Sequence, residues 1–161
     1  MSEVSPEARE LQELINDTFW TEKGHFALAS WWRGAHLAIG VTATVGSAVA
    51  GAAVIARANP VVPGLAALIA TVAGGLLTFL KPVERSDPHL KCGRQLGALR
   101  VEMRQTLNLD LPAGAGSNGL REKIAELAAK KARVDETAPH IADVAMWWVN
   151  RRMKGGAFTS T

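Results

Sequence analysis

The feature that most constrains this chain is a long central stretch with almost no charge. Between Gly34 and Leu80 the sole Lys, Arg, Asp or Glu is Arg57, which divides the stretch into two uncharged runs. Each run reaches the roughly 20 residues that carry a helix across about 30 Å of hydrocarbon. Buried helices of a water-soluble bundle would normally carry a polar face, which these runs of Ala, Gly, Val, Leu and Ile lack. We therefore expect a hairpin of two transmembrane helices, 35–56 and 61–80.

Basic residues flank this hairpin on one side. Lys23 and Arg33 precede it and several Lys and Arg follow it, whereas the connection between its helices holds only Arg57. Because cytoplasmic segments next to a membrane are enriched in Lys and Arg, both termini should lie in the cytoplasm. Tryptophan rings and long cations are favoured at the membrane surface, so the candidate interface anchors are Trp31, Trp32 and Lys81.

Helical spacing dominates the flanking segments. Ser5-Pro6-Glu7 supplies an N-cap, a proline at the first helical position and an acid in the first turn. An amphipathic helix should therefore begin near residue 6 and run into the first span unless Gly24 interrupts it. Asp87-Pro88 predicts a second helix start. The helix after it carries a narrow apolar seam suited to docking on another helix, formed by Cys92, Leu96, Leu99, Met103 and Leu107.

The rest of the chain is also predicted to be helical. After a Gly-, Ala- and Ser-rich loop over 112–119, one helix carries Leu120, Ile124, Leu127 and Val134, and another follows Pro139 with Ile141, Val144, Ala145 and Trp148. The expected fold class is thus an all-α membrane protein, in which an N-terminal amphipathic helix and a C-terminal cytoplasmic helical domain flank the transmembrane hairpin. The expected regions are 1–34, the hairpin 35–80, a cytoplasmic assembly or sensor region 81–154 and a flexible tail 155–161.

Small and hydroxyl-bearing residues recur at helical spacing inside both spans. This stripe either lets helix backbones approach closely or, in an oligomer of hairpins, lines a narrow pore. The residues concerned are Gly40, Thr44, Ser47 and Gly51 in the first span and Thr71, Gly75 and Thr78 in the second. A pump or carrier would keep an ionisable group at membrane depth, whereas neither span holds a Lys, Arg, Asp or Glu and His36 lies at the very start of the first span, so any conductance should discriminate poorly among ions.

The segment after the hairpin carries an excess of Lys and Arg, whereas residues 1–34 carry an excess of Asp and Glu. The basic excess either serves membrane orientation, anionic lipid and docking of the two ends, or forms a receptor for a phosphate-bearing ligand. The candidate phosphate ligands are Arg94, Arg100, Arg104, Arg151 and Arg152. Trp147 or Trp148 could stack a base.

Enzymatic motifs are lacking. The four histidines His25, His36, His89 and His140 show no metal-binding spacing, and Cys92 is the sole cysteine, which excludes a disulfide within the chain. We expect no catalytic residues, no cofactor and no metal. His36 and His89 are expected to be interfacial residues, with a pH-sensing role as the alternative, and Cys92 an inert helix residue.

The order of these elements resembles the SLATT domain, the SMODS and SLOG-associating two-transmembrane effector family of bacterial conflict systems. Features in keeping with the resemblance are the tight turn 57–60, the exit Lys81-Pro82, the helix 88–107 and the late helical segment around 134–139. The resemblance covers roughly residues 6–150 and is one of architecture and spacing.

The resemblance implies an oligomeric effector that perforates or depolarises the bacterial inner membrane under control of a nucleotide or oligonucleotide made by a partner nucleotidyltransferase. The expected partners are therefore the lipid bilayer, further copies of the chain and that ligand. Two alternatives stay open: a non-conducting scaffold anchored by its hairpin, and a holin-like lysis protein.

Overall fold

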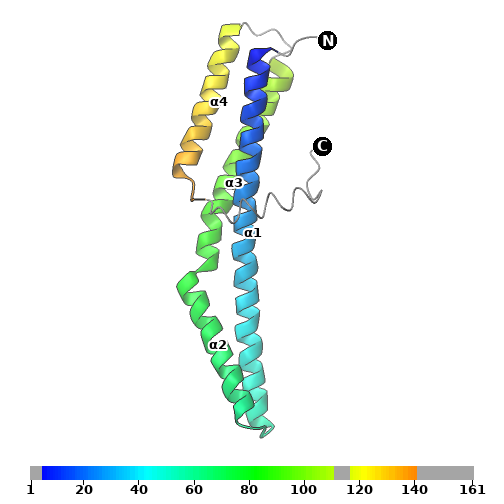
Figure 1. Cartoon of the computed structure of the whole chain (residues 1–161), viewed down its shortest axis with the longest axis vertical. Helices are drawn as coiled ribbons and strands as arrows, with labels where there is room; N and C mark the ends of the chain where they lie inside the picture. The colour runs from blue at the N-terminus through cyan, green and yellow to red at the C-terminus, as the bar shows by residue number, and fades with distance from the viewer. Residues whose placement is uncertain (1–4, 111–116, 141–161) are drawn as a thin grey trace. The chain divides into compact units, whose positions relative to one another are not determined.

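The computed structural model describes residues 5–110 and 117–140, and these residues are almost entirely helical (Figure 1). The elements are α1 (Pro6–Ile55), α2 (Val61–Leu80), α3 (Pro82–Gln105), a π-helical turn (Thr106–Asp110) and α4 (Ser117–Thr137). No strand occurs within the described ranges, which confirms the predicted all-α class for them.

The start of α1 follows from its first residues. The Ser5 hydroxyl accepts a hydrogen bond from the Ala8 N–H at 3.2 Å, and Pro6 occupies the first helical position, where its missing N–H costs nothing. Gly24 is buried within the helix and does not interrupt it. The predicted continuous helix into the first uncharged run is therefore confirmed, and it ends at Ile55.

A short turn, residues 56–60, joins α1 to α2. Arg57 adopts a φ of 54°, in the left-handed region that helps the chain to reverse. The Asn59 side-chain oxygen accepts a hydrogen bond from the Val61 N–H at 3.0 Å, and this satisfies a donor that the start of a helix leaves open. The predicted tight turn between neighbouring antiparallel helices is confirmed.

Small residues bring α1 and α2 into contact. A Cβ added at Gly46 would lie 3.1 Å from the Ala66 carbonyl oxygen and 3.2 Å from the Ala70 Cβ. Ala66, Ala70 and Ala73 are the buried residues of α2. Close approach of two smooth helix faces therefore holds this hairpin together, as expected where helices pack without large side chains between them.

The start of α3 differs from the prediction. Lys81 adopts a φ of 44° and donates its N–H to the Leu77 carbonyl at 3.1 Å, which ends α2, and α3 then begins at Pro82. The prediction that Asp87-Pro88 starts a helix is wrong, because Pro88 lies inside α3. Proline at such a position removes one backbone hydrogen bond and favours a kink. Asp87 lies instead 3.8 Å from Arg33 of α1.

Later boundaries also shift. The π-helical turn continues α3 and carries Leu107, the last residue of the predicted seam. Helix α4 begins at Ser117, so Gly119 belongs to a helix and not to the predicted loop over 112–119. Residues 111–116 and the helix expected after Pro139, with Trp148, lie outside the described residues.

The apolar seam of α3 packs as predicted. One core cluster joins Leu11 of α1 to residues of α3 and α4. Cys92 and Leu96 are buried further along the same seam, and Val134 of α4 is half-buried. The other buried members of the cluster are Leu99, Met103, Leu120, Ile124 and Leu127.

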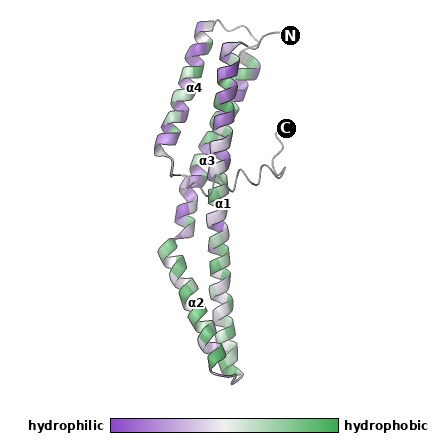
Figure 2. Ribbon diagram, viewed as in Figure 1, coloured by the Kyte–Doolittle hydropathy of each residue, from purple (hydrophilic) through white to green (hydrophobic). Residues whose placement is uncertain are grey.

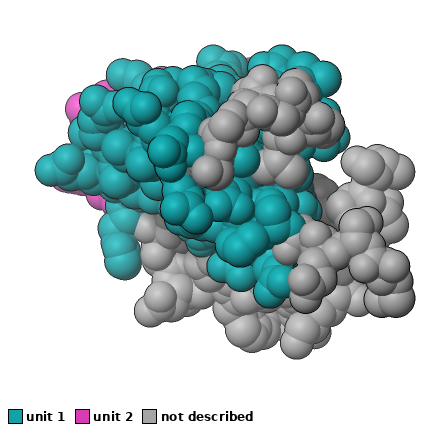
Figure 3. Space-filling view, turned by 90° about the horizontal axis from the view of Figure 1, so that it is seen from above, with its two compact units in different colours: residues 1–28, 88–161 teal, residues 29–87 magenta. Residues whose placement is uncertain are grey.

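The chain divides into two compact units, coloured separately in Figure 3. One comprises residues 29–87, and the other brings residues 1–28 together with the chain from Pro88 onward. Hydrophobic residues dominate the second half of α1 and α2, whereas α3 and α4 are mostly polar (Figure 2). Two helices, α1 and α2, are long and apolar enough to cross a membrane, and only 11% and 17% of their most apolar windows are buried.

The contact at Gly46 predicts a sharp sensitivity to side-chain size. Gly46→Val should force α1 and α2 apart and lower the free energy of unfolding by roughly 1–3 kcal/mol, the usual cost of overpacking. Gly74→Val is the matched control, since a Cβ at Gly74 meets no atom within 4 Å. Denaturant unfolding in detergent, followed by circular dichroism, measures both. Equal stability of the two variants would contradict the assigned contact.

Candidate functional site

The hydroxyl groups predicted to line a pore face away from the α1–α2 contact. Thr44, Ser47, Thr71 and Thr78 are exposed, and each donates to the carbonyl four residues earlier in its own helix, at 2.8–3.1 Å. Within one copy of the chain, these side chains therefore leave an outward face that combines small residues with internally bonded hydroxyls.

The three predicted glycines of this stripe differ in their surroundings. A Cβ at Gly40 would lie 3.9 Å from Leu77, an ordinary contact, whereas a Cβ at Gly51 or Gly75 would meet nothing within 4 Å. The tight contact of the hairpin is made by Gly46, which the sequence analysis did not single out. Most of the predicted stripe thus plays no part in packing α1 on α2.

Two of the three predicted interface anchors, Trp32 and Lys81, contact side chains of α3. Trp31 is 58% exposed, and its ring packs edge-on against Trp32 with centroids 4.7 Å apart. The Arg85 guanidinium lies over the Trp32 ring at 5.2 Å. Lys81 is exposed and pairs with Glu84 at 3.1 Å. These aromatic and cationic groups have the chemistry of a membrane–water boundary.

Arg100 forms an ion pair with a buried acid. Its Nε lies 2.7 Å from the Glu22 carboxylate, whose side chain is 6% exposed, and its guanidinium also lies 5.3 Å from the Phe19 ring centroid. The Glu22 carboxylate also lies against Gly97, where an added Cβ would be 3.5 Å from its nearest oxygen, an ordinary contact. A buried carboxylate needs such a partner, so Arg100 serves the packing of α1 on α3.

The remaining predicted phosphate ligands do not converge with Arg100. Arg94 and Arg104 are exposed and make no ion pair with the described residues, but ten positions separate them, about 15 Å along a helix. Arg151 and Arg152 lie outside the described residues, as do Trp147 and Trp148. The described ranges therefore do not assemble an arginine cluster for a phosphate.

Two histidines meet in the core between α1 and α3. The Nδ1 atoms of His25 and His89 are 3.0 Å apart, and the two residues are 1% and 6% exposed. Burial lowers the pKa of His25 to about 4, with a further contribution from the charge of His89, and burial also lowers the pKa of His89. His89, expected near the membrane interface, lies on the buried face of α3.

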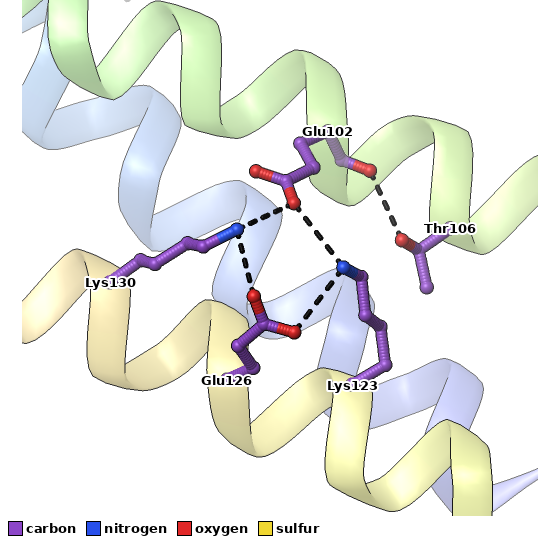
Figure 4. A network of polar contacts seen from close by, with 5 residues as sticks. All are labelled: Glu102, Thr106, Lys123, Glu126 and Lys130. Carbon is purple, nitrogen blue, oxygen red and sulfur yellow. Dashed lines mark hydrogen bonds and ion pairs between the residues drawn. The ribbon is translucent and has the colours of Figure 1, made fainter.

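A charged network ties α3 to α4 on the surface (Figure 4). Lys130 lies 2.8 Å from the Glu102 carboxylate and 3.0 Å from that of Glu126, and Lys123 contacts the same two acids at 3.4 and 3.3 Å. The hydrogen bond from Lys130 is the main cause that holds the pKa of Glu102 below its usual value. The network orients α4 on α3 and uses lysines that the sequence analysis grouped with the basic surface.

Sequence reasoning missed the pairing of Glu22 with Arg100 and that of His25 with His89. A usable signal was present, since Glu22 and His25 lie one turn apart on a helix whose apolar positions face the same way. No group of three or more His, Cys, Asp or Glu side chains among the described residues could hold a metal ion.

Comparison with protein-family models, with curated proteins and with solved structures found no match to this chain. The resemblance to the SLATT family therefore remains an expectation drawn from the layout of the sequence.

The Glu22–Arg100 pair predicts that Arg100 and Arg104 differ in their effects on stability. Arg100→Ala should lower the free energy of unfolding by roughly 3 kcal/mol, because it leaves the Glu22 carboxylate buried without a partner. Arg104→Ala, an exposed control four residues away, should stay within about 0.5 kcal/mol of the parent protein. Urea unfolding in detergent, monitored by circular dichroism, compares them. Indistinguishable losses would contradict the structural role of Arg100.

Proposed function

We propose that this chain crosses the bacterial inner membrane as the α1–α2 hairpin, with both termini in the cytoplasm. In this proposal several copies assemble into a poorly selective pore that depolarises the membrane, as an effector of an antiphage conflict system. The observation that carries the proposal is the large exposed apolar surface of the hairpin.

That surface has no counterpart in an ordinary soluble protein, where contiguous exposed apolar patches rarely exceed a few hundred Å². Large aliphatic and aromatic side chains of both helices are between 43% and 85% exposed. A bilayer, further copies of the hairpin or both can cover them. The group includes Val41, Val45, Val49, Leu65, Leu68, Ile69, Val72, Leu76 and Phe79.

The outward hydroxyl face supports a pore made by several copies. One hairpin cannot enclose a channel, so a conduit requires an assembly in which Thr44, Ser47, Thr71 or Thr78 faces a shared axis. Hydroxyl groups favour wetting of a narrow passage, and the lack of charge in both spans favours poor discrimination among ions.

Control by a nucleotide or oligonucleotide rests on the resemblance to the SLATT family. The described residues add no phosphate site to that expectation, because Arg100 is paired with Glu22 and the exposed arginines Arg94 and Arg104 are far apart along α3. The helices α1, α3 and α4 supply a packed bundle on which such a signal could act by binding two states unequally.

Two rival functions predict different membrane behaviour. A scaffold anchored by its hairpin should leave the bilayer closed. A holin-like lysis protein should open it without any cytoplasmic signal. Permeability of a reconstituted bilayer distinguishes the scaffold from the other two, and dependence of that permeability on an added ligand distinguishes the last two.

Dye release from vesicles tests the pore. The purified chain in vesicles of anionic bacterial lipids should release a small entrapped dye, with a rate that rises more steeply than linearly with protein density. The double variant Thr44→Val, Ser47→Ala should slow release several-fold, because it removes hydroxyls from the proposed lining.

Thr42→Val is the matched control for that variant. Thr42 is also exposed and bonded to its own helix, through the Ala38 carbonyl at 2.9 Å, but it points in another direction around α1. Its variant should release dye at the parental rate. Intact vesicles at every protein density would contradict the pore and favour the scaffold, and equal slowing by all hydroxyl variants would contradict the assigned lining.

A further inference from the structure

The contact between His25 and His89 has a property that no other polar contact among the described residues of the bundle shares. It joins two groups of the same kind, each able to gain a proton, across the packed faces of α1 and α3. A hydrogen bond between two Nδ1 atoms requires one of them to carry the hydrogen and the other to offer its lone pair. The contact therefore constrains the protonation state of both rings.

The contact can persist when one of the two rings is protonated, but not when both are. When one ring gains a proton, it can still donate from Nδ1 to the bare Nδ1 of its neighbour. When both rings are protonated, both Nδ1 atoms carry hydrogens and two positive charges face each other at 3.0 Å inside the bundle. The bond is then lost and the charges repel, so the second proton favours separation of the rings.

Titratable groups on three helices lie near this pair, and none of those described neutralises it. On α1, Glu22 lies one turn before His25, but its carboxylate is taken by Arg100 of α3. On α4, Asp135 favours the charged form of His25, but its carboxylate is held by Lys131 at 2.6 Å. On α3, the thiol of Cys92 lies one turn after His89 and is buried.

We propose that the His25–His89 contact is an acid-sensitive latch, which holds α1 against α3 near neutral pH and releases them when both imidazoles become protonated. The ligand of this site is the proton itself. The proposal concerns the bundle alone and does not depend on whether the hairpin forms a pore.

The direction of the effect follows from the pKa values of the closed and open states. The pKa of His25 is about 4 in the closed bundle and about 6.5 in an exposed imidazole, so the open state binds more protons between these values. Acidification from pH 7.5 to pH 5 should therefore increase the opening equilibrium constant roughly 30-fold through His25 alone. His89 adds to the effect, because its pKa is also lowered.

The acidic network between α3 and α4 responds in a different pH range. The pKa values of Glu102 and Glu126 are held below 4.5 by hydrogen bonds from Lys130 and Lys123, so their stabilising contribution persists above that value and is lost only as pH falls through the lowered values. Between pH 6.5 and pH 5 the histidine pair therefore opposes packing, whereas this acidic network does not.

Cys92 supplies a native reporter for release. It is the single cysteine of the chain, it is 4% exposed, and burial raises the pKa of its thiol. An aromatic pyridyl disulfide, which reacts with thiols in mild acid, measures its accessibility in the full-length chain in detergent. The ratio of this rate to that of the denatured chain at the same pH removes the intrinsic pH dependence of the reagent.

The parent protein should show a relative Cys92 reaction rate that rises at least about tenfold between pH 7.5 and pH 5, with helical circular dichroism retained. The double variant His25→Asn, His89→Asn places an amide donor and acceptor near the former Nδ1 positions, so its rate should stay flat. His140→Asn, an exposed histidine outside the pair, is the control and should behave as the parent.

The single variant His89→Asn keeps the test decisive if the double variant does not fold. Its amide oxygen can accept from the His25 N–H in either charge state of His25, so the rise should be smaller than in the parent. A flat profile in the parent would overturn the latch. So would a rise of parental size in the folded asparagine variants.

Discussion

The packing of this structure depends on the continuity of α1, a single helix whose first half is polar and whose second half is nearly uncharged. The uncharged half packs on α2, through a contact at Gly46 so close that a single methyl group would strain it. The polar half packs on α3 and α4 through Leu11, Glu22 and His25. The apolar half thus packs on an apolar helix, and the polar half packs on helices that supply charged and polar partners.

The sequence was informative where one physical rule decides the outcome. Length and lack of charge predicted the end of α1 to within one residue and both ends of α2, and the period of Cys92, Leu96, Leu99 and Met103 identified the buried face of α3. It was misleading where two rules compete. Pro88 reads as a helix start, but Pro82 after the left-handed Lys81 is an equally good one, and the earlier proline begins the helix.

The candidate site was harder to predict, because side-chain partners come from segments far apart in the chain. Arg100 looked available for a phosphate until the structure placed Glu22 beside it, 78 positions earlier in the sequence. The same holds for His25 and His89, which are 64 positions apart. Composition shows that such groups exist, but only the packing of α1 on α3 shows which of them are already bonded.

The exposed hydroxyl groups of the two apolar helices can suit either acyl chains or water. Each Thr and Ser on the outward face hides its polarity by donating to a carbonyl of its own helix, so the face is compatible with acyl chains. The hydroxyl oxygen still has lone pairs, and a rotation about one side-chain bond can offer the hydrogen to water. In the proposed pore, the same residues would suit a lone hairpin in lipid and a ring of hairpins around a hydrated centre.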